Sequence, residues 1–101
     1  MTGMDTKELR ERIGAKWRSD PVKIEAEEKR IASLRDEDPT HYQMYVHLWG
    51  AQWYRGGPIS RAELAELLGV GARSVERWEA GDTVPHRLAR KAIDQLREAV
   101  A

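Results

Sequence analysis

The chain has 101 residues, of which 41% are hydrophobic and 34% charged, and its formal net charge is zero. A chain of this length is expected to form one domain with a single modest core, which excludes a large multidomain enzyme. The composition is too apolar for a disordered chain, and no apolar stretch approaches the roughly 18 residues of a membrane-spanning helix. The charged N-terminus has no secretory apolar segment, so we expect a soluble, cytoplasmic protein. The absence of cysteine excludes disulfides and thiolate metal sites.

Helix-forming residues dominate the sequence, and the alternating β-branched runs typical of strands are absent. We therefore predict an all-α fold. The first helix is predicted over residues 5–17, because Leu9, Ile13 and Trp17 are spaced by four and share one face. Gly14 interrupts this helix.

Two Asp-Pro pairs each predict the start of a helix, since Asp caps a helix and Pro fits its first position. Asp20-Pro21 opens a helix to about Arg35, whose thin apolar face consists of Ile24, Ile31 and Leu34. Asp38-Pro39 opens a helix to about Tyr54. The latter carries an aromatic stripe, expected to face the core, with a self-association or partner face as the alternative: Tyr42, Val46, Trp49 and Trp53.

After a break at residues 55–59, Ser60 and Glu63 have the spacing of a capping box, which predicts another helix start. The apolar side of this helix is expected to be Leu64, Ala65, Leu67 and Leu68. Gly69 ends it, and a helix over residues 71–80 follows, ended by Gly81. A last helix runs from Pro85 to about Val100, with its inward positions at Leu88, Ala92, Ile93 and Leu96 and at Val100.

In the helix at residues 71–80, Val75 and Trp78 are three residues apart and are expected to face the core. This register turns four residues outward: Ala72, Arg73, Glu76 and Arg77. Two helices of about nine residues joined by a short turn with a glycine follow the helix-turn-helix plan.

The chain resembles the phage-repressor, Cro-like (XRE) family of helix-turn-helix proteins. The resemblance spans residues 59 to about 91 and rests on Glu63-Leu64-Ala65, Leu68-Gly69-Val70, Ser74-Val75, Trp78-Glu79, Gly81 and Pro85. It implies a compact domain of the lambda-repressor-like type at residues 38–101, preceded by a helical extension at residues 1–37. The last helix usual in the family is missing. For the extension, dimerisation, binding of a partner and covering of the core all remain open.

The resemblance implies that residues 71–80 form a recognition helix in the major groove of double-stranded DNA. The implied base contacts are Ala72, Arg73, Glu76 and Arg77, and the implied phosphate contacts are Ser60, Arg61, Ser74, Arg87, Arg90 and Lys91. Arginine suits base reading because its forked donors match the edge of guanine. Glu79 is expected to be structural and to pair with a basic residue of the preceding long helix, with Arg55 as the candidate, while Trp78 fills the core.

The resulting expectation is a nucleoid-associated, sequence-specific transcriptional regulator, a repressor that binds an inverted repeat as a homodimer with half-sites about 34 Å apart. One alternative is an antitoxin or anti-activator that binds a protein partner through residues 1–35. Another is a phage DNA-packaging or recombination accessory protein. No catalytic motif is present, and His41, His47 and His86 lack metal-ligand spacing, so no enzyme, cofactor or metal is expected.

Overall fold

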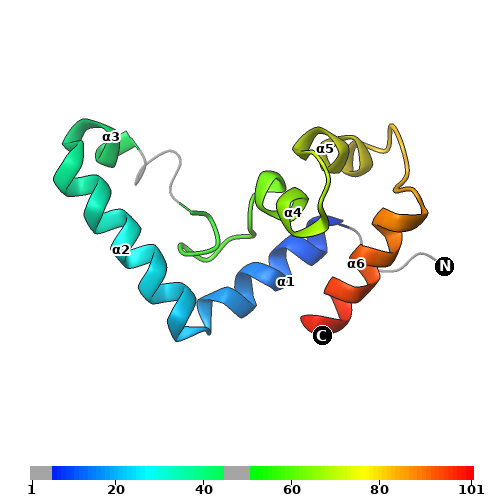
Figure 1. Ribbon diagram of the computed structural model, residues 1–101, viewed down its shortest axis with the longest axis horizontal. Coiled ribbons are helices and arrows are strands. Elements are labelled where there is room, and N and C mark those ends of the chain that lie inside the picture. The colour runs from blue at the N-terminus through cyan, green and yellow to red at the C-terminus, as the bar shows by residue number, and fades with distance from the viewer. Residues whose placement is uncertain (1–5, 45–50) are drawn as a thin grey trace.

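The computed structural model describes residues 6–44 and 51–101, which contain six helices and no strand. The helices are α1 (Thr6–Arg18), α2 (Pro21–Glu37), α3 (Pro39–Met44), α4 (Arg61–Leu68), α5 (Ala72–Ala80) and α6 (Arg87–Ala99) (Figure 1). The prediction of an all-α fold is confirmed for these ranges. Within them, no helix combines the length and the apolar character needed to cross a membrane.

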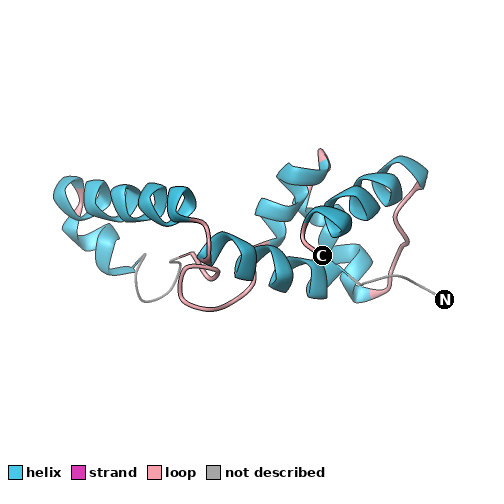
Figure 2. Ribbon diagram, turned by 90° about the horizontal axis from the view of Figure 1, so that it is seen from below, coloured by secondary structure: helices cyan, strands magenta, loops and turns pink. Residues whose placement is uncertain are grey.

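The protein is elongated, with principal extents of 47 × 27 × 20 Å. At one end, α1, α4, α5 and α6 pack together, and we call these four helices the body. At the other end, α2 and α3 project away from them, and we call residues 21–44 the arm (Figures 1 and 2). Neither α2 nor α3 lies beside α5 in Figure 1. The arm therefore stands clear of α5.

All four helices of the body contribute to one hydrophobic core. Leu9 and Ile13 of α1 are buried in the same cluster as Leu64 of α4, Val75 of α5 and Ile93 of α6. The predicted division between residues 37 and 38 therefore does not separate two cores. Of the three roles left open for the N-terminal extension, α1 covers the core, because its apolar residues spaced by four form a stripe that is buried in this cluster.

The ends of α4 and α5 follow from local hydrogen bonds. The hydroxyl oxygen of Ser60 accepts from the Glu63 amide at 3.1 Å, and the Glu63 carboxylate accepts from the Ser60 amide at 3.0 Å, so the predicted capping box is confirmed. Gly69 and Gly81 end the two helices with φ angles of 72° and 82°. This left-handed conformation favours glycine because it has no Cβ.

The predicted helix from Asp38 to Tyr54 is wrong at its C-terminal end. The described residues of α3 run to Met44, residues 45–50 lie outside the description, and residues 51–57 form a series of turns where the prediction had a helix. Of the predicted aromatic stripe, Tyr42 is half-buried in α3 and Trp53 is buried in the turns. The remaining two positions, Val46 and Trp49, lie outside the described residues.

Contacts with α1 explain why the turns replace a helix at Trp53. The ring of Trp53 packs edge-on against Trp17, with 5.6 Å between the ring centroids. One guanidinium nitrogen of Arg18 donates to the carbonyl oxygens of both Trp53 and Gly57 at 2.7 Å. The Trp53 carbonyl thus accepts from Arg18 and from the Gly56 amide, while the Gly57 amide, which a continuing helix would direct to Trp53, donates to the carbonyl oxygen of Gln52.

Two leucines that were expected to face the core are exposed. Leu67 is 47% exposed at the edge of the buried face of α4, which Leu64 and Leu68 occupy. Leu88 is 74% exposed in the first turn of α6. It lies about 140° around the helix from the buried Ile93, which takes it out of reach of the core.

The predicted interruption at Gly14 is wrong, because α1 continues through it; Gly14 instead lets α1 lie directly against the turn that precedes α4. A Cβ atom at this position would lie 2.6 Å from the carbonyl oxygen of Gly57 and 3.2 Å from the Cβ of Trp53. A Gly→Ala change inside a helix ordinarily stabilises the protein by about 0.5–1 kcal/mol. We expect Gly14→Ala to have the opposite sign and to destabilise the protein by about 1–3 kcal/mol in urea denaturation, because backbone has to move.

The exposed neighbour Ala15 supplies the control. Ala15→Gly should cost only the difference in helix propensity, about 1 kcal/mol. A Gly14→Ala protein more stable than the wild type would contradict the close contact between α1 and the turn.

Candidate functional site

The helices α4 and α5 are adjacent in sequence and pack closely, with residues 69–71 as the turn between them. Val75 on the inner face of α5 is completely buried, and Trp78 packs against the same core. Because α5 is fixed by this inner face, its opposite face is presented to solvent in one orientation.

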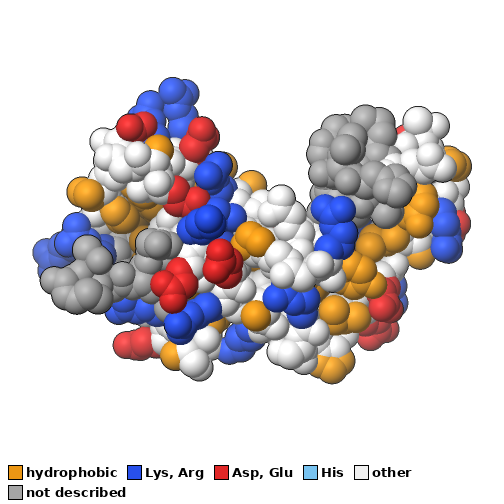
Figure 3. All heavy atoms as spheres, turned by 180° about the vertical axis from the view of Figure 1, so that it is seen from behind, with side chains coloured by type: hydrophobic (Ala, Val, Ile, Leu, Met, Phe, Trp, Pro, Cys, Tyr) orange, Lys and Arg blue, Asp and Glu red, His pale blue; other side chains and the backbone are white. Residues whose placement is uncertain are grey.

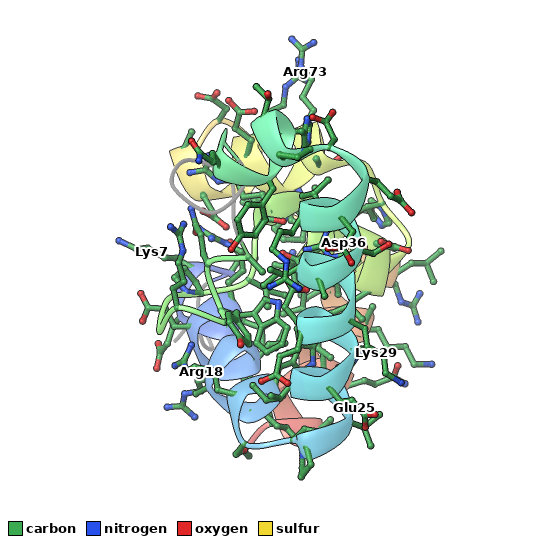
Figure 4. The ribbon with its side chains drawn as sticks, turned by 90° about the vertical axis from the view of Figure 1, so that its left-hand side faces the viewer. Lys7, Arg18, Glu25, Lys29, Asp36 and Arg73 are labelled. Atoms are coloured by element: carbon green, nitrogen blue, oxygen red, sulfur yellow. The ribbon has the colours of Figure 1, made fainter. Side chains whose placement is uncertain are left out.

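The outward face of α5 carries the four predicted base-contacting residues, all of them exposed: Ala72, Arg73, Glu76 and Arg77. Arg73 extends away from the rest of the protein (Figure 4). In the part of the chain that the structure describes, neither Arg73 nor Arg77 has an ion pair or a side-chain hydrogen bond. Ser74 is half-buried at the margin of this face. The structure thus brings two arginines with available donors together on one helix face.

The start of α4 holds the two other residues predicted near this face. Ser60 is the N-cap, and its hydroxyl oxygen is engaged by the Glu63 amide. The Nε of Arg61 donates to Glu79 at 3.1 Å, while the Arg61 side chain remains 49% exposed. Both residues therefore have structural contacts, and Arg61 also keeps part of its guanidinium in solvent.

The partner predicted for Glu79 is wrong. Glu79 forms a two-pronged ion pair with Arg10 of α1, in which Nε lies 3.0 Å and Nη2 2.8 Å from the two carboxylate oxygens. Each of these side chains is only 9% exposed. Arg55 is not part of this ion pair: the basic partners of Glu79 are Arg10 and Arg61, on α1 and α4, the two helices that contact α5.

Sequence reasoning did not identify Arg10 as this partner. The sequence does contain an indication of this role: Arg10 directly follows Leu9 and lies three residues before Ile13, which places it at the edge of the apolar stripe of α1. The third guanidinium nitrogen of Arg10 donates to the carbonyl oxygen of Ile59 at 3.0 Å. Arg10 therefore connects α1 to the residue that precedes the α4 cap as well as to α5.

Charge keeps Glu79 ionised in this partly buried place. Burial by itself raises the pKa of Glu79, but hydrogen bonds from Arg10 and Arg61, the positive charge of Arg10 and a hydrogen bond from Thr6 together bring it below its ordinary value. The ionised carboxylate holds α1, α4 and α5 together.

Three further predicted residues, Arg87, Arg90 and Lys91, lie on the exposed side of α6 and line a shallow depression together with Asp94. Arg90 donates to the carbonyl oxygen of Pro85 at 3.2 Å. Asp94 lines the same depression and pairs with Arg97 at 3.3 Å. These cations form a second basic group, on a different helix from Arg73 and Arg77.

The two histidines that the structure describes lie apart from the outward face of α5, on α3 and at the start of α6. The Nδ1 of His86 accepts from the Ala89 amide at 3.3 Å and caps α6. His41 is exposed in α3, and His47 lies outside the described residues. Across residues 6–44 and 51–101, no group of three His, Asp or Glu side chains is arranged to hold a metal ion.

Removing the Glu79 carboxylate leaves the buried guanidinium of Arg10 with a single carbonyl acceptor. We expect Glu79→Ala to lower the free energy of unfolding by about 3–5 kcal/mol at neutral pH, measured by urea denaturation. Glu66→Ala, which removes an exposed carboxylate from α4, should change it by less than about 0.5 kcal/mol. Similar losses for the two variants would contradict a structural role for the ion pair.

The pH dependence gives an independent measurement of the same pair. Because folding lowers the pKa of Glu79, its contribution to stability is present above the ordinary pKa of a glutamate and is lost as pH falls through the lowered value. The difference in unfolding free energy between the wild type and Glu79→Gln should therefore shrink as pH is lowered from about 7 to about 3. A difference that stays constant over this range would show that the carboxylate charge is not what stabilises the fold.

Comparisons of the chain with protein families, with curated proteins and with solved structures found no match in any of the three. A functional interpretation therefore depends on the residues of α4, α5 and α6 and on the geometry described above.

Proposed function

We propose that the protein is a sequence-specific DNA-binding transcriptional regulator, a repressor, and that α4 and α5 form a helix-turn-helix motif with α5 as the recognition helix. The observation that carries this proposal is the outward face of α5. It presents Arg73 and Arg77 with available donors, next to Ala72 and Glu76, on a helix whose inner face is fixed in the core.

The dimensions and chemistry of this face suit the major groove. The groove is about 12 Å wide and admits one α-helix. Ala72 at the start of α5 allows close approach and can contact a thymine methyl group, while the forked donors of Arg73 or Arg77 match O6 and N7 of guanine. Glu76 lies on the same exposed face, where it can accept from the amino group of cytosine.

The start of α4 supplies the phosphate contacts in this proposal. Amides at a helix N-terminus favour an anion, and Ser60, Arg61 and Ser74 lie at the margins of the reading face. The hydrogen bond to Glu79 restricts the Arg61 side chain, whose exposed part keeps donors for a phosphate oxygen. Acidic and basic side chains are mixed on the face of the protein seen in Figure 3, so affinity depends on where these few cations lie.

A homodimer follows from the size of the reading face. One short recognition helix buries too little surface for tight specific binding, and a second copy doubles the contacts. Two copies related by a two-fold axis would read an inverted repeat with half-sites about 34 Å apart.

Selection of bound sequences from random duplex DNA tests the proposal. At about 150 mM salt, where purely electrostatic binding is weakened, we expect enrichment of a two-fold symmetric motif. No enrichment by a folded protein would contradict sequence-specific binding and would favour a protein partner in place of DNA.

Substitutions on α5 separate base reading from attraction by charge. Arg73→Ala and Arg77→Ala should each cost about 1–3 kcal/mol in binding and relax the preference at one base pair, while Arg61→Ala should weaken all sequences alike. Lys29→Ala on α2 is the control, because it removes one positive charge from a side chain that points in a different direction from Arg73 (Figure 4). Wild-type specificity in both α5 variants would contradict the assignment of the recognition helix.

A further inference from the structure

The start of α6 carries large apolar side chains that no described residue covers. Val84 is 77% and Leu88 74% exposed, and they are two of the four exposed large hydrophobic residues in the described part of the chain. They lie next to the three cations on the outer side of α6. We call this set the α6 patch: Val84, Arg87, Leu88, Arg90 and Lys91. Apolar residues flanked by one sign of charge are typical of a surface that binds a partner.

The positive charge of the α6 patch is not neutralised within the described residues. Neither Arg87 nor Lys91 has an ion pair there, and Arg90 is bonded to a neutral carbonyl. The one carboxylate that lines the same depression, that of Asp94, forms its ion pair with Arg97. A partner that covers this surface therefore has to be acidic.

This charge argues against a dimer in which two α6 patches pack on each other. A two-fold axis through the patch would place three cations of one copy against the same three cations of the other, and like charges brought together across an interface cost several kcal/mol. The surface that fits the α6 patch has to be a different part of the partner.

The chain itself has an acidic surface at its other end. Asp36, Glu37 and Asp38 are the only three consecutive acidic residues in the sequence, and all three are exposed where α2 passes into α3. We call these three residues the arm tip. One opposing charge, Arg35, lies 3.6 Å from Asp36. The arm tip and α6 lie at opposite ends of the long axis (Figure 1).

Contacts at the base of the arm hold it in one orientation. Lys23 of α2 lies 4.4 Å above the ring of Trp17, and the Tyr54 hydroxyl donates to Glu28 at 3.4 Å. Ile24 packs against the core of the body. Since α2 is a rod of 17 residues, about 25 Å long, it presents the arm tip well away from the body at little entropic cost on binding.

We propose that two copies of this chain pair antiparallel, with the arm tip of each copy on the α6 patch of the other. Two reciprocal contacts close the assembly on a two-fold axis, whereas a single contact repeated in one direction would give an open chain. This inference deepens the proposed function, because it locates the dimer that DNA reading needs. It also assigns Arg87, Arg90 and Lys91 to a protein interface in place of the phosphate contacts expected from the sequence.

Charge reversal with rescue, measured by sedimentation of the full chain without DNA, tests the pairing. The patch variant is Arg87→Glu with Lys91→Glu, and the tip variant is Asp36→Lys with Glu37→Lys. Both should keep the fold, since acids favour the start of a helix and bases its end. Each variant alone should raise the dimer dissociation constant at least about tenfold, and an equimolar mixture of the two should form a heterodimer. The protein with all four changes should regain the homodimer.

The control variant, Lys7→Glu with Lys29→Glu, changes the net charge as much as the patch variant but lies outside both surfaces, and it should dimerise like the wild type. A wild-type protein that stays monomeric over a roughly hundredfold concentration range would overturn the pairing. So would loss of the dimer without rescue in the mixture. If the patch variant stays dimeric but binds DNA more weakly with a flatter salt dependence, the α6 cations contact phosphate, and the pairing is wrong while the proposed function stands.

Discussion

The body of this protein depends on the buried ion pair between Arg10 and Glu79. These residues are 69 positions apart in the sequence, and Arg10 also reaches the carbonyl oxygen of Ile59, 49 positions away. One guanidinium thus fixes the orientation of α5 on α1 and the point where the chain enters α4. Because the pair is buried, removing either partner would leave an unpaired charge in the protein interior and strongly destabilise the fold. The outward face of α5 can be presented in one orientation only while this contact holds.

Other contacts of α1 explain how a long segment is accommodated between α1 and α4. Residues 19–60 separate two helices that share one core, yet the cost of closing a loop grows only slowly with its length. Both ends of this segment are held against α1: Arg18 bonds to two carbonyl oxygens of the returning turns, and Gly14 lets the chain pass close by at Gly57. The arm can therefore project from the body without loosening the core.

Local signals in the sequence predicted the helix starts and stops well, because caps and left-handed glycines act within a few residues of where they stand. Ser60 with Glu63, and Gly69 and Gly81, are of this kind. The incorrect predictions concern distant contacts. Trp53 leaves the helical path to pack on Trp17, and Glu79 finds a partner in a helix that the sequence places far away. Periodicity also misplaced Leu88, because its position in α6 lies about 140° around the helix from the buried Ile93.

The net charge of the chain is zero, but its acidic and basic side chains are unevenly distributed between the arm and the rest of the protein. The arm, residues 21–44, holds four basic and six acidic side chains, whereas the rest of the chain holds thirteen basic and eleven acidic ones. The elongated shape separates the arm from the body, so these opposite excesses lie toward different ends of the protein. A polyanion would be drawn to the body and repelled by the arm tip, while a second copy would be drawn to both ends at once. In the proposed function the same separation of charge therefore orients the duplex toward α5 and leaves the arm free to complete the dimer.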